Sequence, residues 1–167
     1  FVIDQFNNVD NRAGYLPMGE EILAQLDGPV DAFVAGIGTG GCFSGNAEVL
    51  KAANSATLCV AVEPANSRPL AGLAPTGPHR LEGMGVGFVT GIMRVDLVDE
   101  TIAVTDDEAK GAARELARRG GVFAGLSSGA NVFAARQIAG KLGPGKKVVT
   151  VLCDSGLRYL QGDLYST

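Results

Sequence analysis

The stretch Asp31–Gly45, DAFVAGIGTGGCFSG, decides the fold of this chain. Its apolar run Ala32–Ala35 predicts a strand, and four glycines follow within six residues: Gly36, Gly38, Gly40 and Gly41. Glycine takes positive φ without strain and leaves backbone N–H groups uncovered. With the positive end of a helix over Gly41–Ala52 behind them, such groups bind a dianion. We therefore expect a phosphate-binding turn, with a turn kept only for close packing as the alternative.

The same glycines are also compatible with a dinucleotide-binding site. Gly36, Gly38 and Gly41 satisfy the G-x-G-x-x-G pattern. Glu63 follows the next apolar run, Leu58–Val62, at about the distance expected of a ribose-binding acid. The spacing alone is therefore compatible with a nicotinamide or flavin dinucleotide as well as with a simple phosphate.

Apolar runs alternate with helical patterns along most of the chain. Further strands are predicted over Leu58–Val62, Thr101–Val104, Gly121–Ala124 and Val148–Cys153, and further helices over Pro17–Leu26, Asp106–Arg119 and Ser128–Leu142. This alternation predicts an α/β fold, with a three-layer, open, mostly parallel sheet and helices on both faces.

Local sequence patterns predict further structural detail in three segments. Thr105 and Glu108 predict a capping box at the start of the helix over Asp106–Arg119. Val148–Cys153 is apolar on both parities apart from Thr150, which is typical of a central parallel strand. Residues 63–100 form a long irregular segment rich in proline and glycine, and loops of that length in a compact domain are usually functional.

Composition narrows the classes of function. The chain has 167 residues, 46% of them hydrophobic, which predicts a single domain with a sizeable core. The net charge is −4 and the basic residues are scattered, so we expect no nucleic-acid partner. No apolar run is long enough to span a membrane, so we expect no membrane partner and a cytoplasmic location.

Cysteine and histidine usage argues against a metal site. Cys42, Cys59 and Cys153 are far apart in the sequence and lie in or beside apolar runs, which favours reduced thiols. His79 is the one histidine, and its place after Pro78 in a loop favours a surface or structural role.

A second turn predicts the other side of a ligand site. The sequence GLSSGAN, residues 125–131, follows the short predicted strand and opens a helix. Ser128 is the expected N-cap, which leaves the hydroxyl of Ser127 free to point across the strand ends. Ligands of open α/β sheets bind at the carboxyl ends of the strands, so both turns are expected to face one ligand.

Four motifs together resemble one known family. They are Gly38–Cys42 (GTGGC), Leu81–Phe88 (LEGMGVGF), Gly125–Asn131 and Asp154–Leu160 (DSGLRYL). Their order and spacing resemble the C-terminal half of the cysteine synthase family, fold-type-II pyridoxal-phosphate (PLP) enzymes related to cystathionine β-synthase. The resemblance covers essentially the whole chain and favours PLP over a dinucleotide.

The resemblance implies a role for each motif. It assigns the grip on the cofactor phosphate to Gly38, Thr39, Gly40, Gly41 and Cys42, and a hydrogen bond to the pyridine nitrogen to Ser127. It places a loop on the substrate side of the cofactor, made by Glu82, Gly83, Met84 and Gly85, and it places Asp154 and Ser155 near the pyridine edge. Cys42 departs from the usual threonine, which exchanges a good hydroxyl donor for a weak thiol.

The implied reaction is β-replacement or β-elimination on an activated serine, giving L-cysteine or a β-substituted alanine. A serine partner leaves the pyridine nitrogen largely neutral, which favours β-elimination over reactions that need a long-lived carbanion. The implied substrate is a small amino acid.

The family's Schiff-base lysine lies upstream of the matched segment, and no lysine of this chain replaces it: Lys51, Lys110, Lys141, Lys146 and Lys147 all fall on predicted solvent-facing helices or turns. We therefore expect residues 1–167 to be a single domain, the C-terminal cofactor-binding portion of a longer two-domain enzyme. Alone it is expected to be inactive, to bind PLP non-covalently at most, and to associate as a homodimer or through uncovered surface. A non-catalytic phosphate-binding or partner-binding module and a nicotinamide-dinucleotide domain are the alternatives.

Overall fold

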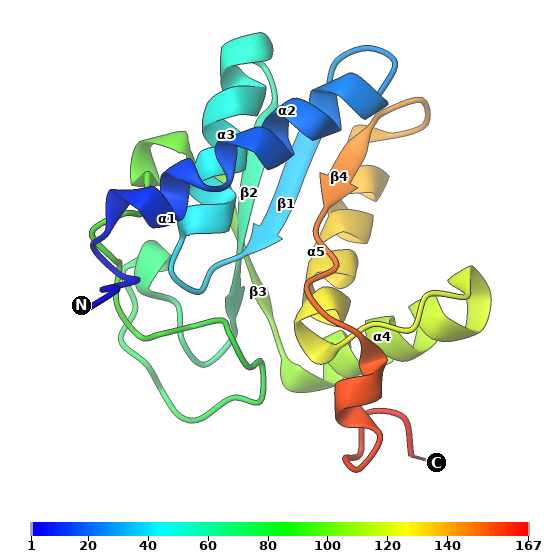
Figure 1. Ribbon diagram of the computed structural model, residues 1–167. Coiled ribbons are helices and arrows are strands. Elements are labelled where there is room, and N and C mark those ends of the chain that lie inside the picture. Colours follow the sequence, from blue (N-terminus) through cyan, green and yellow to red (C-terminus); the bar gives the residue numbers. More distant parts are fainter. Residues whose placement is uncertain (1, 167) are drawn as a thin grey trace.

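Parallel strands form the sheet in a computed structural model that describes residues 2–166 (Figure 1). Within these residues the strands are β1 (Ala32–Gly36), β2 (Leu58–Pro64), β3 (Glu100–Val104) and β4 (Val148–Thr150), in the order β3-β2-β1-β4. Every neighbouring pair is parallel. The predicted fold class, an open parallel sheet between helical layers, is confirmed.

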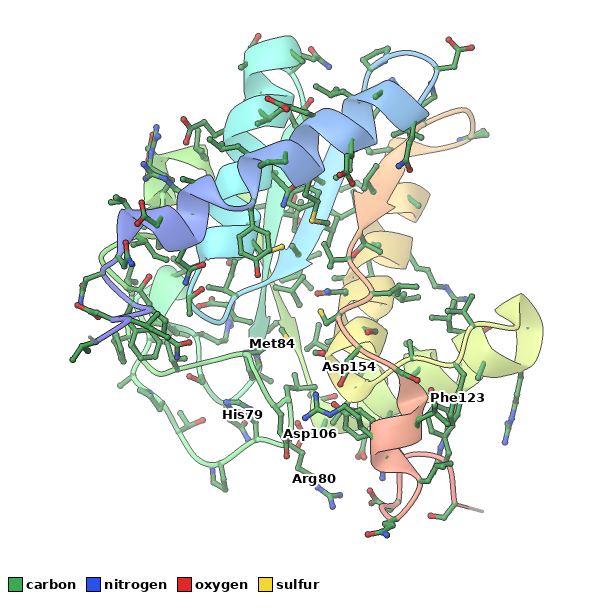
Figure 2. The ribbon with its side chains drawn as sticks, viewed as in Figure 1. His79, Arg80, Met84, Asp106, Phe123 and Asp154 are labelled. Atoms are coloured by element: carbon green, nitrogen blue, oxygen red, sulfur yellow. The ribbon has the colours of Figure 1, made fainter. Side chains whose placement is uncertain are left out.

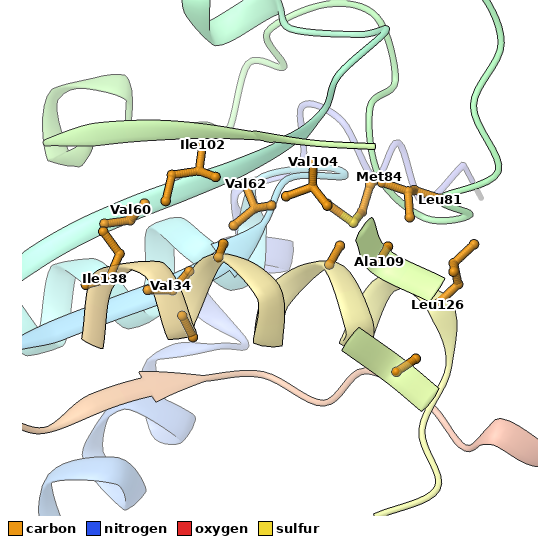
Figure 3. Packing of buried hydrophobic residues seen from close by; sticks show 14 of the residues in the cluster. Val34, Val60, Val62, Leu81, Met84, Ile102, Val104, Ala109, Leu126 and Ile138 are labelled. Carbon is orange, nitrogen blue, oxygen red and sulfur yellow. The ribbon is translucent and has the colours of Figure 1, made fainter. Parts of the chain in front are cut away.

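Alternation along the strands builds two separate cores. Ala32 and Val34 of β1 face one side, together with Val60 and Val62 of β2, whereas Phe33 of β1 faces the other side. The first side is covered by α4 (Asp106–Gly120) and α5 (Leu126–Leu142). Figure 3 shows Val34 and Val60 next to Ile138 of α5, and Val104 of β3 next to Met84.

The other face is covered by helices from the first third of the chain. They are α1 (Val9–Ala13), α2 (Leu16–Gln25) and α3 (Gly41–Ala53). Phe33 packs with Phe43 of α3 at a ring-centroid distance of 6.2 Å. Short 3-10 turns lie outside these layers: η1 (Pro69–Ala71), η2 (Val95–Leu97) and η3 (Gly156–Tyr159).

The order of the strands sets where a ligand can bind. From β1 the chain crosses one face through α3 to reach β2, and from β3 it crosses the opposite face through α4 and α5 to reach β4 (Figure 1). The direction of winding therefore reverses between β1 and β4. Ligands of open α/β sheets bind at the carboxyl ends of strands at such a switch point.

Two predictions around α5 are wrong. Residues 121–124 form no strand, because Ala124 makes only an isolated antiparallel bridge with Ser155. The helix begins at Leu126 with Gly125 as its N-cap, so Ser128 lies inside the helix. Ser128 is fully buried, and its hydroxyl accepts a hydrogen bond of 2.9 Å from the backbone N–H of Cys153. A long-range contact uses the hydroxyl that the local pattern assigned to capping.

The last strand is shorter than predicted and lies at the sheet edge. The expected central strand Val148–Cys153 is β4, which ends at Thr150 and pairs only with β1. Beyond Thr150, α5 side chains take over the backbone contacts: Asn131 donates to the carbonyl of Val151 at 2.8 Å, and Ser128 accepts from Cys153. Hydrogen bonds to a helix end the strand although its residues remain apolar.

The capping box of α4 is confirmed. The backbone N–H of Glu108 donates to Thr105 Oγ1 at 3.2 Å, and the N–H of Thr105 donates to the Glu108 carboxylate at 2.8 Å. Within residues 2–166 no helix is both long enough and apolar enough to cross a lipid bilayer.

Replacing Thr105 with Ala should lower the free energy of unfolding by about 1 kcal/mol, because it leaves a backbone donor at the start of α4 without its acceptor. Urea unfolding followed by circular dichroism measures the change. Thr76→Ala is the matched control, since Thr76 is exposed in the loop after η1. Equal losses in the two variants would contradict the role of the cap.

Candidate functional site

The turn between β1 and α3 offers uncommitted backbone donors. Gly40 is the N-cap of α3 and lies in the left-handed region at φ 85°. Among residues 2–166, the N–H groups of Thr39, Gly40 and Cys42 donate to no acceptor. The hydroxyl of Thr39 accepts from the N–H of Gly41 at 3.2 Å, which leaves its own hydrogen free to donate. Such donors at a helix N-terminus form an anion site.

Close packing joins this turn to a second loop. A Cβ added to Gly38 would lie 2.1 Å from the carbonyl oxygen of Gly83, so no larger residue fits there. Thr90 donates its hydroxyl hydrogen to the carbonyl of Thr39 and holds the turn from its other side. The glycine at position 38 is thus required by space, because its backbone lies against Gly83.

Cys42 is the second residue of α3 and is half-buried. Its carbonyl accepts from Asn46 Nδ2 at 2.8 Å, and its Sγ lies 3.7 Å from the same nitrogen. Burial raises the pKa of the Cys42 thiol to about 11. The thiol therefore stays protonated at neutral pH and is only a weak donor.

The loop Glu82–Gly85 forms a wall of the site. Glu82 and Gly83 are exposed, whereas Met84 is buried with its side chain against Gly36 at the end of β1. The N–H of Gly85 donates to the carbonyl of Ile37 at 2.8 Å. Figure 2 shows Met84 beside the strand ends, with Asp154 on the far side of the opening.

A cavity of about 340 Å³ lies between these two sides. Glu82, Gly83 and Met84 line it from one side, and Ser127 and Asp154 line it from the other. Gly36, which the sequence analysis placed in the glycine turn, also lines the cavity. So do Cys153, Arg158 and Tyr159, to which the sequence analysis gave no role in the site. Residues 38–42, Gly85 and Ser155 do not line the cavity, although Gly38 lies directly against Gly83.

Ser127 lies in the first turn of α5 and is 6% exposed. Cys153 lines the same cavity beside Ser127. Burial raises the pKa of the Cys153 thiol, and a hydrogen bond with Ser127 partly offsets that rise. Two neutral groups, a hydroxyl and a protonated thiol, therefore meet at this end of the cavity.

Asp154 is held by its own turn. One carboxylate oxygen accepts from the Tyr159 hydroxyl at 2.9 Å and from Arg158 at 3.1 Å. Its other oxygen is buried, without a partner in the described chain, against Gly125, where a Cβ would lie 2.0 Å away. Burial, and then the bond to Asp154, raises the pKa of Tyr159 to about 12. Arg158 follows Asp154 by four residues, and Tyr159 follows it by five. This spacing in the sequence could have indicated that their side chains lie close to the carboxylate.

Two further residues from the sequence analysis have structural contacts. Glu63 is 2% exposed, and its Oε1 accepts from the N–H of Leu70 at 2.8 Å. Its carboxylate is therefore not available to a ribose. Ser155 accepts from the N–H of Leu157 and caps η3.

A larger cavity of about 650 Å³ lies beside the first and shares Glu82 and Tyr159 with it. Two of the charged groups that line it are paired with a third: Arg80 and Lys110 both contact Asp163, at 2.9 and 2.6 Å. Residues 2–166 gather no group of three or more His, Cys, Asp or Glu side chains suited to a metal ion.

Known proteins are similar to this chain in sequence and in fold. The model of the family described as pyridoxal-phosphate dependent enzyme matches residues 1–154. A cysteine synthase of Staphylococcus aureus is 45% identical over 168 residues, covering 99% of this chain and 54% of that protein.

Solved structures are also similar to this chain in sequence and in fold. The O-acetyl serine sulfhydrylase isoform 3 of Entamoeba histolytica is 40% identical with a TM-score of 0.95, covering 100% of this chain and 50% of that one. The O-acetylserine dependent cystathionine beta-synthase of Helicobacter pylori is 39% identical with a TM-score of 0.90, covering 97% and 53%.

The chain spans about half the length of the curated relatives it matches. The family resemblance read from the four motifs is confirmed, and with it the assignment of PLP as the family's cofactor. The chain belongs to the family of pyridoxal-phosphate dependent enzymes.

Proposed function

We propose that this chain is the cofactor-binding portion of an enzyme that uses PLP for β-replacement or β-elimination on an activated serine, as a cysteine synthase does. The observation that carries the proposal is an anion cradle packed against one wall of a cavity whose other side holds a neutral hydroxyl. The cradle is the turn at Thr39–Cys42, and the hydroxyl belongs to Ser127. The names and sequences of the relatives support the choice of reaction.

The residues present fit the cofactor. The phosphate would be held by the N–H groups of Thr39, Gly40 and Cys42 and by the hydroxyl of Thr39, where the start of α3 supplies a positive end. The loop Glu82–Gly85 would lie on the substrate side. When bound, PLP supplies the electron sink for the reaction, and the protein tunes that sink through its contact with the ring nitrogen.

Ser127 is the better partner for the ring nitrogen. Asp154 would hold the nitrogen protonated, but one of its oxygens is engaged by Arg158 and Tyr159 and the other lies against Gly125. The carboxylate is therefore restrained beside the cavity while the Ser127 hydroxyl lines it. A neutral ring nitrogen is a weaker electron sink, which favours loss of the β-substituent.

We propose that the Schiff-base lysine lies outside these 167 residues. Among residues 2–166, no lysine lines the cavity between Met84 and Asp154. Lys51 contacts Asp99 at 2.7 Å, Lys110 contacts Asp163, and Lys141 contacts Glu100 at 2.6 Å. Lys146 and Lys147 precede β4 at the opposite end of the sheet. Residues 1–167 would then form one domain of a two-domain enzyme.

The remaining parts of the proposal concern partners and location. A small amino acid as substrate and the cytoplasm as location follow from the proposed reaction. Homodimers are favoured by exposed apolar side chains, among them Phe88 at 51% and Leu157 at 66% exposed.

A non-catalytic phosphate-binding module is the second candidate function, because the cradle needs no lysine to bind an anion.

Titrating the chain with PLP tests the proposal. We expect saturable binding, followed by absorbance and calorimetry, that inorganic phosphate displaces and NAD does not. Borohydride treatment should leave the cofactor unattached, since no lysine reaches it. Stoichiometric attachment to one lysine of this chain would refute the assignment of the lysine, and tight binding of NAD would refute the choice of cofactor.

Side-chain changes in the cradle should move phosphate affinity in opposite directions. Thr39→Val removes a hydroxyl donor and Cys42→Thr adds one. A hydrogen bond to a charged group contributes about 1.5–3 kcal/mol. Each change should therefore shift the PLP dissociation constant by at least about tenfold, upward for the first and downward for the second. Thr76→Val is the matched control. Equal affinity in all three variants would place the phosphate elsewhere.

A further inference from the structure

The carbonyl oxygen of Gly85 accepts two side-chain hydrogen bonds. Ser67 Oγ donates to it at 3.0 Å, and His79 Nε2 lies 3.2 Å from it. The N–H of the same residue donates to Ile37. Gly85 therefore ties the end of the loop Glu82–Gly85 to three other parts of the chain: the segment leaving β1, the turn after β2, and the loop that carries His79.

Ser67 is held firmly in place by the end of β2. It is 3% exposed, and its N–H donates to the carbonyl of Pro64 at 2.9 Å. The buried carboxylate of Glu63 fixes the same turn by accepting from the N–H of Leu70. A hydroxyl on a turn anchored in this way is a fixed donor, so it can define the position of the loop that it contacts.

His79 supplies the second donor. A carbonyl oxygen can only accept, so the ring nitrogen that faces it, Nε2, must carry the hydrogen. The other ring nitrogen, Nδ1, is buried and has no partner in residues 2–166. Figure 2 shows His79 on the same irregular segment as Met84, outward from the strand ends.

The position of Gly85 matters because its neighbours in sequence form the wall of the site. The carbonyl of Gly83 lies against Gly38 of the phosphate turn, and the side chain of Met84 lies against Gly36. The contact between Gly83 and Gly38 joins two backbones and leaves no room for a side chain between them. Any displacement of Gly85 therefore moves the wall of the cavity and presses on the turn that holds the phosphate.

We propose that Ser67 and His79 are positioning residues of this site, which together set the place of the loop Glu82–Gly85 through the Gly85 carbonyl. The inference rests on the proposed function for its consequence, cofactor binding, and on hydrogen bonding alone for its mechanism. Neither residue lines the cavity between Met84 and Asp154.

Hydrogen exchange tests the mechanism. The variants are Ser67→Ala, His79→Leu and the two combined, and the readout is the exchange rate of amides in residues 82–88. One hydrogen bond of ordinary net strength corresponds to about fivefold in an opening equilibrium, so each single variant should accelerate exchange by about that factor or less. The double variant, which leaves the carbonyl without either donor, should exceed about tenfold.

Rescue separates positioning from general packing. The side-chain amide of His79→Gln can donate from close to the position of Nε2, so it should restore slow exchange, whereas His79→Leu fills similar space without a donor. Ser55→Ala, in the exposed turn between α3 and β2, is the matched control for Ser67→Ala. Amides of β1 should exchange at the same rate in every variant, which shows that the sheet remains folded.

Cofactor affinity, measured from the absorbance of bound PLP, is the second readout. We expect weaker binding in the double variant and recovery when Gln replaces Leu at position 79. Unchanged exchange at residues 82–88 in the double variant, in protein that binds PLP, would overturn the inference. Failure of the unmodified protein to bind PLP would instead refute the proposed function, and the exchange comparison would still decide whether Ser67 and His79 hold the loop.

Discussion

The backbone of the turn after β1 lies directly against the backbone of the loop Glu82–Gly85, and the rest of the site depends on that contact. Gly38 leaves no room for a side chain because the carbonyl of Gly83 occupies the space. Since the contact brings the loop alongside the start of α3, an anion cradle and a cavity wall are built as one unit. The opposite side of the cavity needs only the start of α5 and the turn after β4 to complete it.

Electrostatics divides this site into two ends. Among residues 2–166, the N–H groups of Thr39, Gly40 and Cys42 at the start of α3 have no acceptor, and the first turn of α3 holds no acid, which suits a dianion. The end near Ser127 is kept neutral, because Arg158 and Tyr159 engage the Asp154 carboxylate and the thiol of Cys153 stays protonated. A ligand with a charged phosphate and a neutral aromatic nitrogen matches both ends.

Local patterns in the sequence predicted most of the fold. The capping box at Thr105, the glycine turn after β1 and the alternation of strands and helices each depend on residues close in sequence. The start of α5 and the end of β4 could not be predicted in this way, because Ser128 and Asn131 bond to backbone groups that are 25 and 20 residues away in the sequence. The motifs also located the loop Glu82–Gly85, but its attachment through Ser67 and His79 required the folded chain.

The pairing of β1 with β4 constrains how the molecule assembles. The hydroxyl of Thr150 donates to the carbonyl of Val34 across 116 positions of sequence, so this pairing closes a very long loop. Contacts of such separation form slowly, because the entropy of the intervening chain must be lost first. The turn after β4 carries Asp154. It takes its place near the carboxyl end of β1 only after β4 has paired with β1. A chain in which β4 has not paired with β1 therefore lacks the Asp154 side of the cavity, and the proposed cofactor site is complete only at the end of folding.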